Sequence, residues 1–293
     1  MKTIKLILLF LLFSFMLLVS CEFDPALKVN DTALEIEFSD GTIIVENDIE
    51  FYDSSTCTYF LKSELLPNEN FTDFKIKVNN DSILGGVFFS CFLSSMPPTP
   101  YFISDCFFSG FDVLKIGYYG DGKNRLNDEQ IINSLKENNL FRRGLSCQID
   151  SVQVVESGNE TNVICTIKIT NNDNIAYYIP DVNKMGERYY TDYTGGLSFS
   201  NMNKGPGSFI KDSNSNRQRD DIKISDLEIL KANSEVTYRY TSRNYHPIPA
   251  GEYRVGVRFM GIVYTASEFD LDQKKGRVWV GELYAVKDGI MVE

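Results

Sequence analysis

The feature that most constrains the fold is a series of short apolar or alternating runs, each separated from the next by turn residues. Apolar residues recur at every second position in Ile36 and Phe38, and again in Ile43 and Val45, as in a strand with one buried face. Asp40-Gly41 separates these two runs, and glycine supplies the positive φ that tight turns need. Tyr and Phe are plentiful, with 16 and 21 residues, and both favour sheet. The chain is therefore predicted to be mostly β.

Strands at this spacing, without long helical patterns between them, are typical of sandwiches or barrels. The chain has 293 residues, which is enough for two domains. We expect an N-terminal β-rich domain over 31–145 and a second domain over 146–293, both sandwich-like. A long polar stretch at about 183–221 is predicted to be a loop in the second domain.

One short helix is predicted over about 127–139, connecting the two domains. Asn127 suits the N-cap position, and Gln130 follows three residues later, close to a capping box. Ile131 and Leu135 belong to an apolar stripe at helical spacing. We expect this stripe to pack, with the helix closing the first domain or lying between the two.

The second domain has a recognisable pattern of strands and turns. Residues 162–170 alternate, with Val163, Cys165, Ile167 and Ile169 on one face. Together with residues 230–236 and the turn Pro249-Ala250-Gly251-Glu252-Tyr253, this pattern resembles the immunoglobulin-like modules common in exported bacterial lipoproteins. The resemblance implies an immunoglobulin-like β-sandwich. The insertion at 183–221 departs from it, as does the place of Trp279 near the C-terminus, where the family has its tryptophan in an earlier strand.

The first residues have the composition of an export signal. Lys2 and Lys5 precede an apolar run of 14 residues, Leu6 to Val19, which is short of the roughly 20 residues needed to span a bilayer. The following Leu18-Val19-Ser20-Cys21 resembles the lipobox of bacterial lipoproteins. That resemblance implies removal of residues 1–20, acylation of Cys21 and a tether over 21–30, which would anchor the protein in the outer membrane or at the cell surface. The alternative is an ordinary secreted protein whose cysteine is there by chance.

The residues after Cys21 indicate to which membrane or surface the lipoprotein would be sent. Glu22 is not the aspartate that retains some lipoproteins at the inner membrane. Glu22 and Asp24 also resemble the acidic segment that directs Bacteroidetes-type lipoproteins to the cell surface. Acyl chains on Cys21 are thus the expected contact with the membrane.

Charge excludes one class of partner. The formal net charge is −11, and it becomes more negative when Lys2 and Lys5 are removed with the leader. Such a chain has no basic surplus to displace counterions from phosphates, so we expect no nucleic-acid partner. Anionic headgroups should also repel it.

Five cysteines follow Cys21, and an exported chain can keep disulfides. Cys57 is one of them, and the odd number leaves at least one thiol outside any internal pair. The neighbours Cys91 and Cys106, and Cys147 and Cys165, are the pairs to expect first. Buried reduced cysteine is the alternative for each.

No catalytic or cofactor motif is complete. Gly117 to Lys123 fits the letters of a phosphate-binding loop, but Asn124 stands where Ser or Thr must bind Mg²⁺. His246 is the single histidine, so neither a hydrolytic triad nor a zinc site is supported. We expect no cofactor and no catalytic residues.

A tyrosine cluster is the candidate contact surface for a glycan or a partner protein. Exposed rings could stack on sugars, whereas the alternative is that they pack in the core. The cluster consists of Tyr177, Tyr178, Tyr189, Tyr190 and Tyr193, with Tyr238, Tyr240 and Tyr245 further along the chain.

No metal site is predicted. A Ca²⁺-ordered loop is an alternative interpretation of the segment from Asp212 to Asp221, where oxygen-bearing residues alternate. Arg217 and Lys223 occupy positions where a calcium loop requires Gly and Glu. The ligands would be Asp212, Asn214, Asn216 and Asp220 or Asp221.

These observations favour a non-catalytic binding or structural module on the envelope. A carbohydrate-binding accessory lipoprotein of a polysaccharide-uptake system is the second hypothesis. An extracytoplasmic hydrolase is the third.

Overall fold

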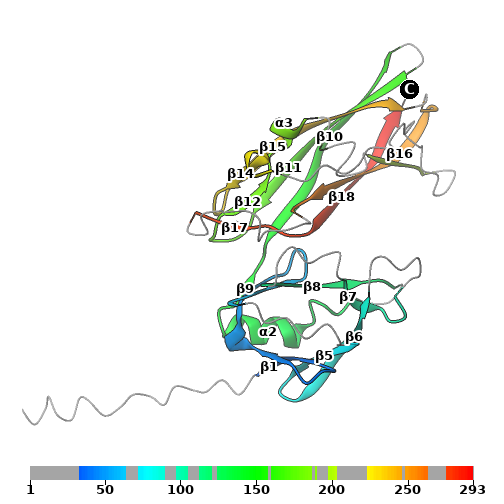
Figure 1. Ribbon diagram of the computed structural model, residues 1–293. Coiled ribbons are helices and arrows are strands. Elements are labelled where there is room, and N and C mark those ends of the chain that lie inside the picture. Colours follow the sequence, from blue (N-terminus) through cyan, green and yellow to red (C-terminus); the bar gives the residue numbers. More distant parts are fainter. Residues whose placement is uncertain are drawn as a thin grey trace, which may run out of the picture.

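The computed structural model describes residues 33–63, 72–89, 97–104, 112–120, 124–157, 160–186, 189, 197–202, 223–245, 248–262 and 275–292. The fold is mostly β and sandwich-like, as the alternating pattern predicts. Figure 1 shows the described strands in two lobes. The N-terminal lobe holds β1 to β9, and the C-terminal lobe begins with β10 at Leu145.

Nine strands of the described residues form one sheet in the N-terminal lobe, in the order β2-β1-β5-β6-β7-β8-β4-β3-β9. Neighbours are antiparallel except for β6 with β7 and β3 with β9. The strands are β1 (Leu34–Phe38), β2 (Ile43–Val45), β3 (Ile49–Asp53), β4 (Thr58–Leu61), β5 (Asp73–Val78), β6 (Asp81–Phe89), β7 (Tyr101–Ser104), β8 (Val113–Tyr118) and β9 (Phe141–Arg142), with a 3₁₀ turn η1 (Glu46–Asp48).

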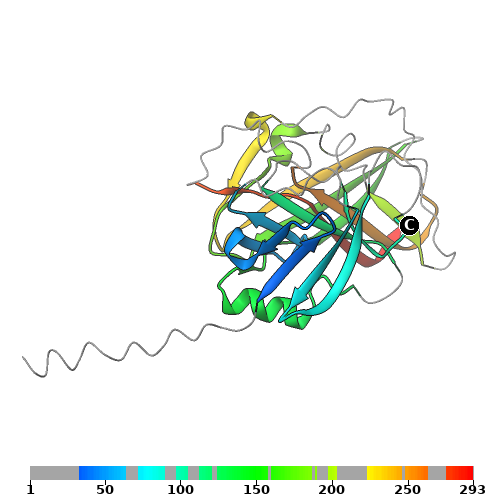
Figure 2. The same ribbon diagram turned by 60° about the horizontal axis from the view of Figure 1, so that its bottom comes forward.

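This sheet curls around its own core. Side chains of β1 and β5, such as Ile36 and Ile76, share one buried cluster with Tyr52 and Tyr59 of β3 and β4, which lie several strands away in the sheet. The helix α2 (Glu129–Glu137) contacts β1 and β5, near one end of the strand order, and β9, at the other end (Figures 1 and 2).

The helix confirms the predicted stripe and corrects the predicted cap. Ile131 and Leu135 are fully buried against the N-terminal core. The N-cap is Asp128, whose carboxylate accepts a hydrogen bond from the backbone N–H of Gln130. Asn127 cannot serve as the cap, because its side chain accepts a hydrogen bond from the Tyr52 hydroxyl and donates one to the carbonyl of Ser54.

The described strands of the C-terminal lobe form three three-stranded sheets, in the orders β10-β11-β15, β14-β12-β17 and β13-β16-β18. All pairs are antiparallel except β12 with β17. The strands are β10 (Leu145–Ser157), β11 (Glu160–Asn171), β12 (Tyr177–Pro180), β13 (Ser198–Asn201), β14 (Leu227–Leu230), β15 (Glu235–Tyr245), β16 (Gly251–Met260), β17 (Arg277–Val278) and β18 (Glu282–Val292), with a short helix α3 (Val182–Met185) and a 3₁₀ turn η4 (Ile224–Asp226).

The buried faces of these sheets share one core. The predicted alternation in β11 is confirmed, since Val163, Cys165, Ile167 and Ile169 are all fully buried. The ring of Tyr238 in β15 stacks 6.1 Å from that of Phe259 in β16, which joins two of the sheets. Phe259 also lies 5.8 Å from the buried ring of Trp279.

The predicted loop at 183–221 is wrong in part. Asp181 caps α3 by accepting hydrogen bonds from the backbone N–H groups of Asn183 and Lys184. Residues Ser198–Asn201 form β13, which pairs with β16. The polar composition hid both elements because each is only four residues long.

A tyrosine hydroxyl fixes the start of β16. Tyr253 is fully buried, and its hydroxyl donates a 2.8 Å hydrogen bond to the carbonyl of Pro249, four residues earlier. This bond ties the turn 249–252 to the strand that follows it. The arrangement has the form of the tyrosine corner of immunoglobulin-like sandwiches.

Tyr253→Phe should lower the free energy of unfolding by about 1 kcal/mol, because it removes this buried hydrogen bond and keeps the ring. Urea unfolding of the purified protein measures the change. Tyr284→Phe is the matched control, since the Tyr284 side chain is exposed and loss of its hydroxyl should cost less than about 0.5 kcal/mol. Equal losses in the two variants would contradict a special role for Tyr253.

Candidate functional site

Three places among the described residues are candidates for a functional site: the junction between the lobes, a hollow beside α2, and the solvent face of the sheet β13-β16-β18.

The junction is built around the peptide that leads from β9 to β10. Asp173, in the turn after β11, accepts hydrogen bonds from the backbone N–H groups of Arg143 at 2.7 Å and Gly144 at 2.9 Å. The Tyr177 hydroxyl donates a third, at 2.7 Å. One carboxylate therefore holds the connecting peptide against the C-terminal lobe.

A second carboxylate lies beside this peptide. Asp53, at the end of β3, is 0 % exposed, and its Oδ1 accepts hydrogen bonds from the backbone N–H and the hydroxyl of Ser55, at 2.8 and 2.6 Å. Oδ2 has no hydrogen-bond partner among the described residues. Burial raises the pKa of Asp53 to about 6 against the lowering effect of Ser55, and the nearby charge of Asp173 adds to the increase.

An arginine also joins the two lobes. Arg277 of β17 forms ion pairs with Glu50, at 3.0 Å, and Asp112, at 3.5 Å, and its guanidinium lies 5.6 Å from the ring centre of Phe60. Phe51, Phe60 and Val113 belong to the N-terminal lobe but are buried in the core of the C-terminal lobe. The junction is thus a continuous buried interface, and its groups hold the lobes together.

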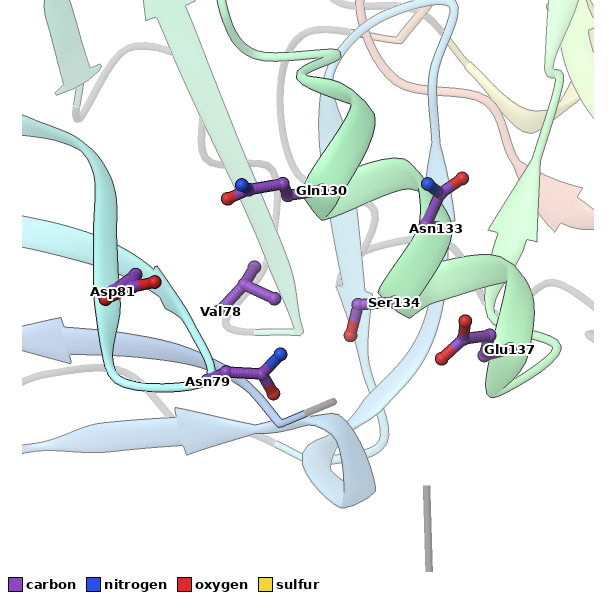
Figure 3. Close-up of a pocket in the computed structure, with 7 residues that line it drawn as sticks. All are labelled: Val78, Asn79, Asp81, Gln130, Asn133, Ser134 and Glu137. Carbon is purple, nitrogen blue, oxygen red and sulfur yellow. The ribbon is translucent and has the colours of Figure 1, made fainter. Parts of the chain in front are cut away.

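The hollow has a volume of about 250 Å³ and lies between α2 and the β5–β6 turn. Figure 3 shows Gln130, Ser134 and Glu137 along α2, with Asn79 and Asp81 on the opposite side. Most of these side chains are exposed, and Ser134 donates its hydroxyl hydrogen to Glu46. Small-molecule sites are mostly apolar with a few directed polar groups, whereas six of the seven residues that line this hollow are polar. The hollow is a weak candidate for a binding site.

The third place, called here the outer face, is the solvent side of β13-β16-β18. Tyr284 is 61 % exposed and lies over Gly256, with its hydroxyl 3.2 Å from that of Ser198. Arg254 forms a two-pronged ion pair with Asp288, at 2.5 and 3.1 Å. The outer face consists of Ser198, Ser200, Glu252, Arg254, Gly256, Arg258, Glu282, Tyr284, Val286, Asp288 and Met291.

The structure favours core packing, the second interpretation of the tyrosine cluster. Tyr177, Tyr189, Tyr238 and Tyr240 are 0 % exposed and Tyr178 is 7 % exposed, so all five pack in the core of the C-terminal lobe. The Tyr189 hydroxyl is used internally, since it donates to the carbonyl of Met260 at 3.0 Å. These rings cannot stack on a glycan. Tyr190, Tyr193 and the side chain of Tyr245 lie outside the described residues.

The predicted bond between Cys147 and Cys165 is also wrong, since both are free thiols. The hairpin register pairs Cys147 with Ile169 and Cys165 with Val152. The two cysteines are thus about four residues apart along the hairpin, or roughly 13 Å, whereas a disulfide needs Cα atoms within about 7 Å. Burial raises the pKa of each thiol to about 12. The predicted alternative, buried reduced cysteine, fits Cys165, whereas Cys147 is reduced but only half-buried.

Several predicted residues lie outside the described part of the chain. They are the acylation residue Cys21, the pair Cys91 and Cys106, and the calcium ligands Asp212, Asn214, Asn216 and Asp220. Among the described residues, no group of three or more His, Cys, Asp or Glu side chains is placed to hold a metal ion.

No protein-family model matches the chain, and no curated protein is significantly similar to it. No helix within the described ranges is long and apolar enough to cross a membrane. Both faces of β18 mix polar and apolar residues, since Tyr284 and Val286 point outward while Lys287 donates a hydrogen bond to the carbonyl of Asp150 in β10. The sequence pattern by itself therefore does not single out the outer face.

Asp53→Asn should remove a pH dependence of stability. The native carboxyl binds its proton more tightly than the unfolded one, so the contribution of Asp53 to stability is greatest below about pH 4 and is lost as the pH rises through about 6. Near neutral pH the variant should be more stable than wild type by up to about 3 kcal/mol, and the difference should vanish towards pH 4. Urea unfolding across this range measures it, and the exposed Asp81→Asn controls for the lost charge. A difference that stays constant with pH would refute the prediction.

Gly144→Ala should destabilise the junction strongly. Gly144 has φ +72°, and an added Cβ would lie 2.0 Å from Asp53 Oδ1 and 2.3 Å from Ser55 Oγ. Gly186→Ala is the control, because its φ is +57° but no atom lies within 4 Å of the added Cβ. Thermal and urea unfolding should show a loss of about 1 kcal/mol in Gly186→Ala and of about 3 kcal/mol or more in Gly144→Ala. Similar losses would mean that the contact with Asp53 is unimportant.

Proposed function

We propose that the protein is a lipid-anchored lipoprotein of the bacterial envelope, held in the outer membrane or at the cell surface, that acts as a non-catalytic binding or structural module. The observation that carries this proposal is the position of Cys21, directly after a basic start and a short apolar run ending in Leu18-Val19-Ser20. Two or more acyl chains on Cys21 would give stable anchoring without a membrane-spanning helix.

The arrangement of the lobes supports a role in which the C-terminal lobe is presented away from the membrane. Strand β1 opens the described chain at the end of the N-terminal lobe that faces away from the C-terminal lobe (Figure 1). A tether attached before β1 would therefore hold the C-terminal lobe on the side away from the bilayer. The buried interface formed by Arg277, Phe51, Phe60 and Asp173 would keep the two lobes moving as one body.

An immunoglobulin-like C-terminal lobe is part of the same proposal. The hydrogen bond from Tyr253 to Pro249 supports it, as does the pairing of β10, β11 and β15 in a sheet that shares its core with β16 and β18. Trp279 lies in that core, although it enters from β17–β18 and not from an early strand. A sandwich of this kind can hold binding residues on a rigid scaffold.

Intact mass spectrometry of membrane-extracted protein tests the anchor. The wild-type chain should start at Cys21 and carry the added mass of acyl chains, whereas Cys21→Ala should lose both the added mass and the membrane association. Cys57→Ala is the matched control, because it also removes one cysteine and should leave acylation unchanged. A water-soluble wild-type chain of unmodified mass would refute the proposal. Protease treatment of whole cells then separates a surface location from a periplasmic one.

A further inference from the structure

We propose that the outer face binds a neutral oligosaccharide, with one sugar ring stacked on Tyr284. This inference rests on the proposed role as a binding module and assigns that role a ligand class and a place. The proposed site uses Tyr284, whose ring is exposed to solvent, in place of Tyr177, Tyr178 and Tyr189, which are buried.

The first argument is the setting of the ring. Tyr284 leans across β16 at Gly256, where a Cβ would lie 2.0 Å from the tyrosine hydroxyl oxygen and 2.5 Å from the Ser198 hydroxyl oxygen. Glycine at this position leaves room for the side chain to lie against the backbone. The contact between the hydroxyl groups of Tyr284 and Ser198, at 3.2 Å, holds the ring across the sheet. One side of the ring is therefore supported by the sheet, and the other is open.

The second argument is the chemistry of such a ring. The face of an aromatic ring is electron-rich, and a pyranose presents C–H groups with partial positive charge on one of its faces. The two surfaces match in size and in charge distribution. Val286 is 45 % exposed and lies opposite Gly256 in β18, which extends the apolar platform beyond the ring.

The third argument is the polar border of the platform. Arg254 with Asp288, and Arg258 with Glu282, form ion pairs whose side chains are about half exposed. Arg254 and Arg258 are each two residues from Gly256, or about 7 Å along the strand, on opposite sides of it. A stacked sugar would carry its hydroxyl groups outward to both pairs, which offer donors on arginine and acceptors on the carboxylates.

The charged side chains around Tyr284 determine which class of ligand the outer face favours. Each pair combines one positive with one negative side chain, so the two pairs together carry no net charge, and the exposed Glu252 on the same face of β16 adds one negative charge. A phosphate or a sulfated glycan would therefore meet more negative than positive groups there. A polyhydroxylated, uncharged ligand gains hydrogen bonds from both members of each pair and meets no opposing charge. This balance favours a neutral oligosaccharide.

Isothermal titration calorimetry of the full-length protein in detergent tests the proposal, with cellohexaose, maltohexaose and mannohexaose as probes. We expect the wild-type protein to bind at least one probe. Tyr284→Ala should weaken that binding roughly tenfold. Gly256→Ala should weaken it similarly, because the added methyl group displaces the tyrosine ring while leaving it in the chain. Circular dichroism and melting temperature establish that both variants are folded.

Tyr119→Ala is the matched control, because Tyr119 is 51 % exposed and belongs to the other lobe. It should bind as wild type does. Failure of all three probes to bind, or binding unaffected by both Tyr284→Ala and Gly256→Ala, would overturn the proposal. Light scattering is run in parallel, and a wild-type dimer that Tyr284→Ala dissociates would assign the face to self-association and equally overturn it. The mass of the Cys21 lipid is measured separately, so failure of the anchor and failure of the glycan site are distinguishable.

Discussion

The two lobes depend on one buried carboxylate, that of Asp173, which accepts hydrogen bonds from the connecting peptide at Arg143 and Gly144 and from the Tyr177 hydroxyl. The turn that carries it is itself fixed, because Asn171 donates to the carbonyls of Ile175 and Lys231 and accepts from the N–H of Asp173. Charge-assisted hydrogen bonds of this kind are stronger than neutral ones. The position of β9, at the end of the N-terminal sheet, is thereby fixed relative to β10, where the C-terminal lobe begins.

Strands buried on both faces extend this constraint into the N-terminal lobe. Tyr52 and Tyr59 of β3 and β4 face the core of the curled sheet, whereas their neighbours Phe51 and Phe60 face the C-terminal lobe. The Phe51 and Phe60 rings stack 4.2 Å apart at that interface. Because adjacent strand residues point to opposite faces, one pair of strands serves two cores.

The outer face, by contrast, is a sheet surface that no described element covers, and this frees Tyr284 for a ligand.

Local patterns were predictable from the sequence where local rules decide the outcome. The alternation in β11 and the stripe on α2 follow from periods of two and 3.6 residues, and both are buried as expected. The cap of α2 was predicted one residue early, because Asn127 has the right chemistry but is engaged by Tyr52, which is distant in the sequence. The tyrosines at 177–189 have the composition of a binding surface but fill a core that the sheets create together.

The sequence by itself determined that this chain is mostly β, where one helix lies and which strand faces are apolar, since these depend on neighbouring residues. Only the tertiary structure decided which tyrosines are buried and why Cys147 and Cys165 are too far apart to bond. It also placed Tyr284 over Gly256, because strand order and register bring distant segments together. Residues far apart in the chain meet through such pairing, and no local period encodes it.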